Sequence, residues 1–435
     1  MQHTPIRLVG QGAAAMATAM GVGRFVYTPI LPLMHTQAGL SAQWGAALAT
    51  ANYIGYLVGA LIAIFIPTLT SDRSVLRGSL VAVVATLALM PATHSDAIWF
   101  ALRLITGVAS ALIFVIAVSA LLTGLRGHAQ HLIGWSFGGV GAGIALSGAF
   151  VLVIRTTGTW QEAWWIAAAL SLVCTVPAWR LPTAAAHTEA TGNTVGPRWF
   201  LALLTSYSLE GIGYIIAGTF LVAAIDQTAA GWVGSGAWVL VGLAALPSTV
   251  LWAWLSRTWS RPGLLATALA VQAIGIALPV LVGGVAAALV SAVLFGATFL
   301  GAASIVLAIG THLRVPRAVA ILTTGYSVGQ ILGPLAVTPL LHNGYHEALL
   351  IGAGVVALAA IAAAALRYRF PHHLGPLPSR LCNSMGRTPG QDAEPNRSGN
   401  RIADRQSSSA AGQQSKFAVR LPFCLEFGPD DGIHE

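Results

Sequence analysis

Apolar stretches long enough to cross a membrane recur along the first 370 residues, and they constrain the fold of this 435-residue chain more than any other feature. Crossing a hydrocarbon layer of about 30 Å, at about 1.5 Å per residue of helix, takes roughly 20 residues. Hydrophobic residues make up 56% of the chain and charged residues 8%, and the mean hydropathy is +0.74. These values exclude a water-soluble globular protein and predict an all-α membrane protein.

Twelve such spans are predicted, and the connections between them are too short to hold a soluble domain. Their approximate boundaries are 8–34, 42–66, 75–93, 97–123, 131–154, 163–181, 199–224, 232–255, 263–283, 285–310, 318–341 and 346–368. The first run extends far beyond the roughly 7–15 residue core of a signal peptide, so we interpret it as a span. Residues 372–435 are polar and rich in Pro, Ser, Gly and Gln, and we expect a disordered cytoplasmic tail there.

The arginines at the ends of these spans and between them predict the orientation of the chain. Arg155 lies alone on one side of the membrane, and twelve arginines lie on the other. Those twelve are Arg7, Arg73, Arg77, Arg126, Arg180, Arg198, Arg257, Arg261, Arg314, Arg317, Arg367 and Arg369. Because positive residues favour the cytoplasmic side, we expect both termini in the cytoplasm of a bacterium and the helices in its inner membrane. The formal charge of +8 then reflects topology rather than nucleic-acid binding.

The second half of the chain repeats the first at an offset near 190. The segment GVGRFVYTPIL at 21–31 resembles GIGYIIAGTFL at 211–221, and SALIFVIA at 110–117 aligns with GAASIVLA at 301–308. In the fifth and eleventh spans, the glycines, aromatic residue and serine within 134–138 align with those within 325–329. Since each half has an even number of spans, the two copies share one orientation and are related by an axis along the membrane normal.

This repeat predicts two pseudo-symmetric six-helix bundles, at 1–181 and 199–371. A cytoplasmic loop at 182–198 joins them, and the tail at 372–435 follows the second bundle. Rocking the two bundles about their seam would expose a central site to each side of the membrane in turn.

Two motifs resemble a known transporter family. In the loop TSDRSVLR at 70–77, Asp72, Arg73 and Arg77 match the Asp-Arg-x-Gly-x-Arg signature of the major facilitator superfamily, with Val75 in place of glycine. The first span, GVGRFVYTPILPLM, and LEGIGYIIAGTFLVA in the seventh resemble the YbfB/YjiJ-type branch of that superfamily. The resemblance, over residues 8–370, implies a major facilitator fold, a gating role for the loop, and a central cavity lined by spans one, four, seven and ten.

Three of those four spans carry polar residues at helical spacing. The stripes consist of Arg24, Tyr27 and Thr28; of Arg103, Thr106 and Ser110; and of Tyr207, Glu210 and Tyr214. An arginine at the middle of a membrane costs roughly 2.5–3.5 kcal/mol on insertion scales, so these faces should point inward rather than toward lipid.

The stripes suggest specific roles. The repeat places Glu210 opposite Met20, one helical turn from Arg24, so Arg24 and Glu210 are expected partners across the seam. In the functional interpretation, Arg24, together with Arg103, binds an anionic group of the substrate, and Glu210 carries the coupled proton. The alternative is a permanent ion pair that joins the two halves.

Other polar residues are candidate ligands with a structural alternative. Tyr27, Tyr207, Tyr214 and Asn52 would contact the substrate or, alternatively, bridge neighbouring helices. The same two roles are open to the amides of Gln272 and Gln330 in the ninth and eleventh spans. The glycines of the GxxxGxxxGP run at 325–334 are interpreted as a packing surface.

The leading function is proton-coupled symport of a small organic anion or amphipathic metabolite. Efflux of drugs or metabolites is the second hypothesis, and a membrane sensor derived from a transporter is a third. An ATP-driven pump needs a Walker lysine, but the sole lysine is Lys416 in the tail. No nucleophile and base can be paired for an enzyme, and no filter loop predicts a channel.

The predicted partners are the lipid bilayer, a small-molecule substrate and protons, without nucleic acid. Cys174, Cys382 and Cys424 show no metal-like spacing, so no metal or cofactor is expected. We expect a monomer.

Overall fold

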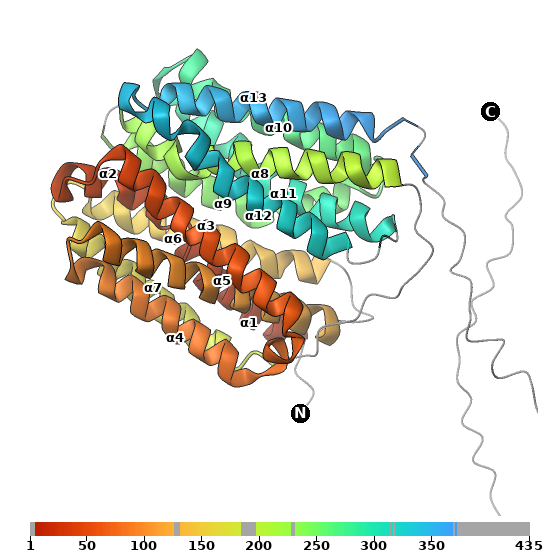
Figure 1. The fold of residues 1–435 in the computed structure, drawn as a ribbon, viewed down its shortest axis with the longest axis horizontal. Coiled ribbons are helices and arrows are strands. Elements are labelled where there is room, and N and C mark those ends of the chain that lie inside the picture. The colour runs from red at the N-terminus through yellow and green to blue at the C-terminus, as the bar shows by residue number, and fades with distance from the viewer. Residues whose placement is uncertain are drawn as a thin grey trace, which may run out of the picture. The chain divides into compact units, whose positions relative to one another are not determined.

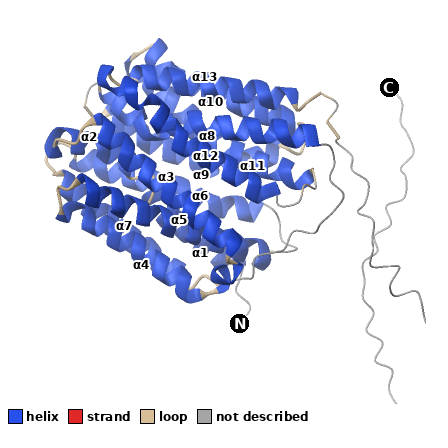
Figure 2. Ribbon diagram, in the orientation of Figure 1, coloured by secondary structure: helices blue, strands red, loops and turns tan. Residues whose placement is uncertain are grey.

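In the computed structural model, all regular secondary structure of the described residues is helical (Figure 2). The described residues are 5–125, 131–183, 197–227, 231–313, 315, 318–368 and 370–371. The predicted tail at 372–435 and most of the predicted loop at 182–198 lie outside them. These two predictions stay expectations.

Residues 5–183, the N-terminal half, form seven α-helices and three short segments. They are α1 (Pro5–Met16), the π-helical η1 (Ala17–Val22), α2 (Tyr27–Ala38), α3 (Ala42–Phe65), η2 (Pro67–Ser71), α4 (Arg73–Leu89), η3 (Met90–Ala92), α5 (Asp96–Gly124), α6 (His131–Ile154) and α7 (Trp160–Ala178). Residues 197–371, the C-terminal half, form α8 (Pro197–Asp226), α9 (Val233–Leu255), α10 (Arg261–Leu281), α11 (Gly284–His312), α12 (Ala318–Val337), η4 (Thr338–Asn343) and α13 (His346–Ala365).

Within the described residues, ten helical segments are long and apolar enough to cross a membrane. The predicted first and sixth spans are not among them. The sixth corresponds to α7, whose first turn contains the polar Gln161 and Glu162. There the Thr159 hydroxyl accepts a hydrogen bond from Glu162 N–H, and the Glu162 side chain accepts one from Thr159 N–H. This capping box fixes the start of α7 but lowers its mean hydropathy.

The predicted first span is a broken helix rather than a continuous one. After α1, the backbone hydrogen bonds span five residues instead of four, which is the π-helical pattern. One of them runs from Gly23 N–H to Thr18 O at 2.9 Å. Residues 23–26 then form a turn before α2 begins at Tyr27. Gly21 packs so closely on α6 that a Cβ there would lie 2.7 Å from the Gly143 Cα. Pro29 also lacks the N–H that would continue the helix from Phe25, so the break has both a packing and a covalent cause.

The two halves of the chain lie on opposite sides of Figure 1, where the red to yellow helices face the green to blue ones. Helices α6 and α9 make the most extensive helix-to-helix contact of the described residues, and α3 contacts α12. At Gly141, a Cβ would lie 2.4 Å from Leu246 N, and at Gly242 it would lie 2.2 Å from Ala145 N. Glycine therefore lets the backbones of α6 and α9 touch, as small residues do in membrane helices.

The glycine run of the eleventh predicted span is confirmed as a packing surface. A Cβ at Gly329 would lie 2.4 Å from Ser208 O, and one at Gly333 would lie 2.6 Å from Ile212 O. Both of these carbonyl oxygens belong to α8. The two glycines therefore let α12 pack closely against α8 within the C-terminal half. This contact places residues of α8 and α12 side by side.

Candidate functional site

A cluster of tyrosines surrounds Arg24 at the break between η1 and α2. Helix α3 contributes two of them, α8 contributes two, and α12 contributes one tyrosine together with an amide. We call this set the central cluster: Arg24, Tyr53, Tyr56, Tyr207, Tyr214, Tyr326 and Gln330. It draws residues from both halves of the chain.

Arg24 is buried and has neutral neighbours. Its side chain is 3% exposed, and its Nη2 donates a hydrogen bond of 2.6 Å to Gln330 Oε1. The guanidinium carbon lies 4.8 Å from the ring centroids of both Tyr53 and Tyr56. Its Nε is buried without a hydrogen-bond partner. A buried cation held by an amide and by π faces keeps donor capacity for an anion.

The remaining tyrosines form a stack beside Arg24. The rings of Tyr207 and Tyr326 lie 4.3 Å apart at 16°, and Tyr214 stacks on Tyr326 at 5.5 Å. The Tyr214 ring also stacks on the Phe299 ring, with 5.9 Å between centroids, and the Tyr214 hydroxyl accepts a hydrogen bond of 3.4 Å from Gln330 Nε2. Tyr207 and Tyr214 are buried, whereas Tyr326 is half-buried. Such parallel aromatic faces suit the apolar part of an organic molecule, and the hydroxyls and Arg24 suit its polar part.

Glu210 lies on α8, between Tyr207 and Tyr214 in the sequence, and is not paired with Arg24. It is 1% exposed, and neither of its carboxyl oxygens has a hydrogen-bond partner. Gln272 of α10 is within electrostatic range, although the two side chains do not meet hydrogen-bond geometry. The pairing expected from the repeat is therefore wrong for this conformation, because the Arg24 guanidinium donates to Gln330 and forms no ion pair with Glu210.

Arg103 stabilises the break in the first helix. Its Nη1 donates to Gly23 O at 3.0 Å, and its Nη2 donates to Arg24 O at 3.2 Å. These carbonyls lie in the turn, where they lack helical partners, and a cation is favoured at such a C-terminal end. The guanidinium of Arg103 is thus occupied by backbone in this structure, and it positions Arg24 through the main chain.

Replacing Arg103 by glutamine is expected to destabilise the protein. Leaving two buried carbonyls without donors costs about 1–3 kcal/mol each, so the free energy of unfolding should fall by about 2–6 kcal/mol. Thermal unfolding of the purified protein measures this, with the exposed Arg198→Gln as the control. An unchanged melting temperature for Arg103→Gln would contradict the structural role.

Tyr27 and Asn52 lie near Arg103 rather than in the central cluster. The Tyr27 hydroxyl donates to Gly45 O at 2.9 Å, and its ring centroid lies 5.0 Å from the Arg103 guanidinium carbon. Asn52 Nδ2 donates to Arg103 O at 3.1 Å, which joins α3 to α5. The predicted common face of Arg24 and Tyr27 is lost because the turn at 23–26 rotates them apart. In this conformation both Tyr27 and Asn52 bridge helices.

The loop residues predicted to gate transport lie at the start of α4. Asp72 is the N-cap of this helix: its Oδ1 accepts a hydrogen bond of 2.7 Å from Ser74 N–H, and this bond lowers the pKa of the carboxyl. Arg73 is exposed. The guanidinium carbon of Arg77 lies 5.2 Å from the ring centroid of Trp179 on α7. In the described contacts Asp72 caps α4, and Arg77 joins α4 to α7.

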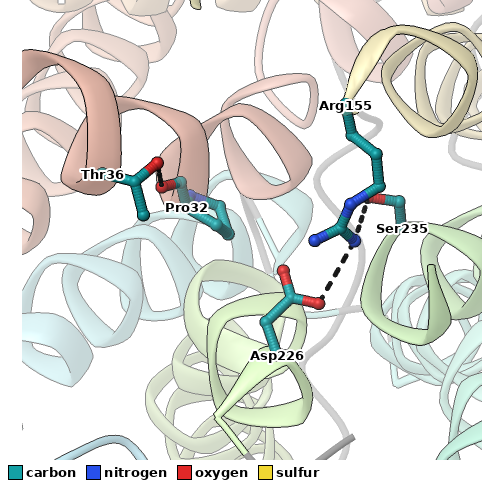
Figure 3. Close-up of polar contacts among 5 residues, drawn as sticks. All are labelled: Pro32, Thr36, Arg155, Asp226 and Ser235. Atoms are coloured by element: carbon teal, nitrogen blue, oxygen red, sulfur yellow. Dashed lines mark hydrogen bonds and ion pairs between the residues drawn. The ribbon is translucent and has the colours of Figure 1, made fainter. Parts of the chain in front are cut away.

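Polar contacts join the two halves beyond the central cluster. Arg155 Nη1, at the end of α6, lies 3.4 Å from Asp226 Oδ1 of α8 and from Ser235 Oγ of α9 (Figure 3). This is the sole ion pair in the part of the chain that the structure describes. His35 Nε2 contacts the Tyr345 hydroxyl at 2.6 Å. Both contacts lie at the end of the helices that the arginine distribution assigns to the outside.

The residues closest to Arg24 were not all candidates from the sequence. Gln330 was predicted only as a general polar residue, and Tyr53 and Tyr326 were not singled out. Tyr53 lies three residues before Tyr56, and Tyr326 is the repeat counterpart of Trp135, so both carried a weak signal. The signal was too weak because aromatic residues are common in apolar helices, and only their convergence distinguishes them.

Comparisons with known proteins agree with this architecture. The family model described as "Uncharacterised MFS-type transporter YbfB" matches residues 16–364, so the chain belongs to that family and the predicted resemblance is confirmed. No curated protein matches the chain. Among solved structures, the chain is similar to the crystal structure of a variant of the nucleoside transporter NupG. The TM-score is 0.64 at 15% identity, over 83% of this chain and 100% of that one, which shows a shared transporter fold.

Proposed function

We propose that this member of the MFS-type transporter family is a secondary active transporter for small organic anions with an aromatic or otherwise flat apolar part. The observation that carries the proposal is the Arg24 guanidinium, which is buried and hydrogen-bonded to the neutral Gln330. Burying an unpaired charge in a membrane is costly, and such residues usually serve function. An anionic group on the substrate would supply the missing counter-charge.

The aromatic stack of the central cluster supports a substrate with an aromatic or flat apolar part. Tyr207, Tyr214 and Tyr326 present near-parallel rings beside Arg24. A flat ring on the substrate would stack there while its carboxylate or similar group reaches the guanidinium. Purely aliphatic anions would gain the charge interaction without the stacking.

Glu210 is the proposed proton-coupling residue. Its carboxyl is buried on α8, the helix that carries Tyr207 and Tyr214, and has no hydrogen-bond partner. A carboxylate there competes with a bound anion for the positive potential of Arg24, so arrival of the substrate would favour protonation of Glu210. This competition couples a proton to the anion and makes symport the proposed mode.

Alternating access is proposed to use twelve spans in two six-helix bundles, with the broken first helix and α7 as the first and sixth spans. The repeat supports this arrangement, because Thr28 of α2 donates a hydrogen bond to Gly218 O of α8 at the same offset of 190 residues. We place the spans in a bacterial inner membrane with both termini in the cytoplasm. The conformation described here is then closed on the outside, and outward opening would break Arg155–Asp226 and His35–Tyr345.

Efflux of amphipathic compounds is the second candidate function. The tyrosine and phenylalanine stack favours it, since π faces also bind organic cations. The buried positive charge of Arg24 disfavours a cation at the same place. The sign of the preferred ligand therefore distinguishes the two functions.

A binding screen of the purified full-length protein tests the proposal. The panel contains aromatic carboxylates, aliphatic carboxylates, zwitterionic amino acids, neutral nucleosides and cationic drugs, and calorimetry measures affinity. We expect aromatic carboxylates to bind most tightly, followed by aliphatic ones. Preferential binding of cations or of neutral nucleosides would overturn the anion assignment.

A further inference from the structure

A groove runs along the outer surface of the N-terminal half, between α4 and α7, which lie side by side in Figure 1. Its volume is about 550 Å³, within the range of roughly 300–1,000 Å³ typical of small-molecule sites. Val81 and Ala85 of α4 and Leu172 and Val176 of α7 line it. On each helix these residues recur three or four positions apart, so one apolar stripe of α4 faces one apolar stripe of α7 across the groove.

One end of the groove is positively charged. Arg180, which follows α7, lines this end together with Trp179. Arg77 stands one helical turn before Val81, with its guanidinium carbon 5.2 Å from the Trp179 ring centroid, and its Nε is buried without a hydrogen-bond partner. Asp72, at the start of α4, caps that helix by accepting a hydrogen bond from Ser74 N–H. One guanidinium group, of Arg180, therefore lines this end of the groove, and a second, of Arg77, lies against the Trp179 ring that lines it.

The wall of the groove also carries a polar atom without a partner. Thr175 lines the groove, its side chain is 5% exposed, and its hydroxyl has no hydrogen-bond partner. A threonine in a membrane helix usually bonds its hydroxyl to a backbone carbonyl one turn earlier. An unused hydroxyl beside an apolar groove suits a glycerol or ester oxygen.

We propose that this groove is a binding site for one anionic phospholipid. An acyl chain lies between the apolar stripes of α4 and α7, the phosphate reaches Arg77 and Arg180, and Thr175 is available to the ester region. The charge at the mouth selects an anionic headgroup over a zwitterionic one, because each basic residue near a membrane surface adds attraction for anionic lipid. The site is separate from the central cluster and independent of the transported substrate.

Native mass spectrometry of the full-length protein tests the proposal, with phosphatidylglycerol and phosphatidylcholine as the added lipids. The wild type should retain one phosphatidylglycerol in preference to phosphatidylcholine. Arg77→Gln and Arg180→Gln should each weaken this retention about fivefold, and the double variant about 25-fold. Arg257→Gln, which removes an exposed arginine that does not line the groove, should retain the lipid like the wild type.

A second variant tests the groove itself. Ala85→Phe fills the apolar part of the groove and leaves both arginines in place, so this variant should also lose the retained lipid. Circular dichroism and gel filtration verify that each variant is folded. Equal losses in Arg257→Gln and Arg180→Gln would mean unspecific attraction at the arginine-rich surface and would overturn the site. Full retention in Ala85→Phe, or equal competition by inorganic phosphate alone, would show that no acyl chain occupies the groove and would overturn it as well.

Discussion

Replacing Arg24 by glutamine is expected to weaken binding of an aromatic carboxylate by roughly 10- to 100-fold. Hydrogen bonds to a charged group contribute about 1.5–3 kcal/mol, and glutamine removes both the charge and the guanidinium donors that face the central cluster. Arg24→Lys keeps the charge but loses the planar donors and the close stacking on Tyr53 and Tyr56, so an intermediate affinity is expected. Calorimetry with the tightest anion from the screen measures all three proteins.

A second variant, Gln330→Glu, tests whether the free positive charge of Arg24, rather than the local structure, determines anion binding. Gln330→Glu keeps Arg24 and places a carboxylate where the amide oxygen now accepts at 2.6 Å. The new ion pair would compete with the anionic ligand, so affinity should fall although the fold gains a buried pair. Wild-type affinity in Arg24→Gln, or tighter anion binding in Gln330→Glu, would refute the role of Arg24.

Replacing Glu210 by glutamine is expected to abolish accumulation of the anion against its gradient while leaving the protein as stable as the wild type or more stable. Breaking a buried ion pair costs about 3–5 kcal/mol, but the Glu210 oxygens have no partner to lose. An amide cannot take up or release a proton, so an imposed proton gradient would no longer drive uptake. Counterflow exchange, which needs no net proton movement, should persist.

Proteoliposomes with an imposed pH gradient measure the accumulation, and thermal unfolding measures stability. Gln272→Leu is the control, because it alters the polar neighbour of Glu210 without removing a titratable group. A melting temperature of Glu210→Gln far below that of the wild type would support the alternative in which Glu210 forms a structural ion pair. Undiminished accumulation in that variant would place the coupling proton elsewhere.

Most of the helical segments were predictable because their periodicity and length reflect the bilayer itself. The apolar runs from 42 to 66 and from 97 to 123 correspond to α3 and α5 within a few residues. The break in the first span was not predicted, because it depends in part on how Gly21 packs on Gly143, more than 100 residues away. The capping box of α7 lowers the hydropathy of its span but was visible in the sequence as Thr159 and Glu162.

For the candidate site, the buried charged residues were predictable from the sequence but their hydrogen-bond partners were not. Arg24, Arg103 and Glu210 were predicted as inward-facing groups because burying a charge in a membrane is costly wherever its partner lies, and all three are buried. Their partners were not predictable. Arg103 donates to the backbone of the broken helix and Arg24 donates to Gln330, whereas Glu210 accepts a hydrogen bond from neither arginine.

The sequence by itself determined the fold family, the helical spans near the bilayer thickness and the identity of the costly charges, since each follows from local composition and from the repeat. Only the tertiary structure decided which groups meet. A repeat offset aligns positions along two helices but does not set their rotation, and a turn of four residues at 23–26 is enough to send Arg24 toward α12 and Tyr27 toward Arg103. Side-chain partnership therefore depends on helix packing, which is a property of the whole chain.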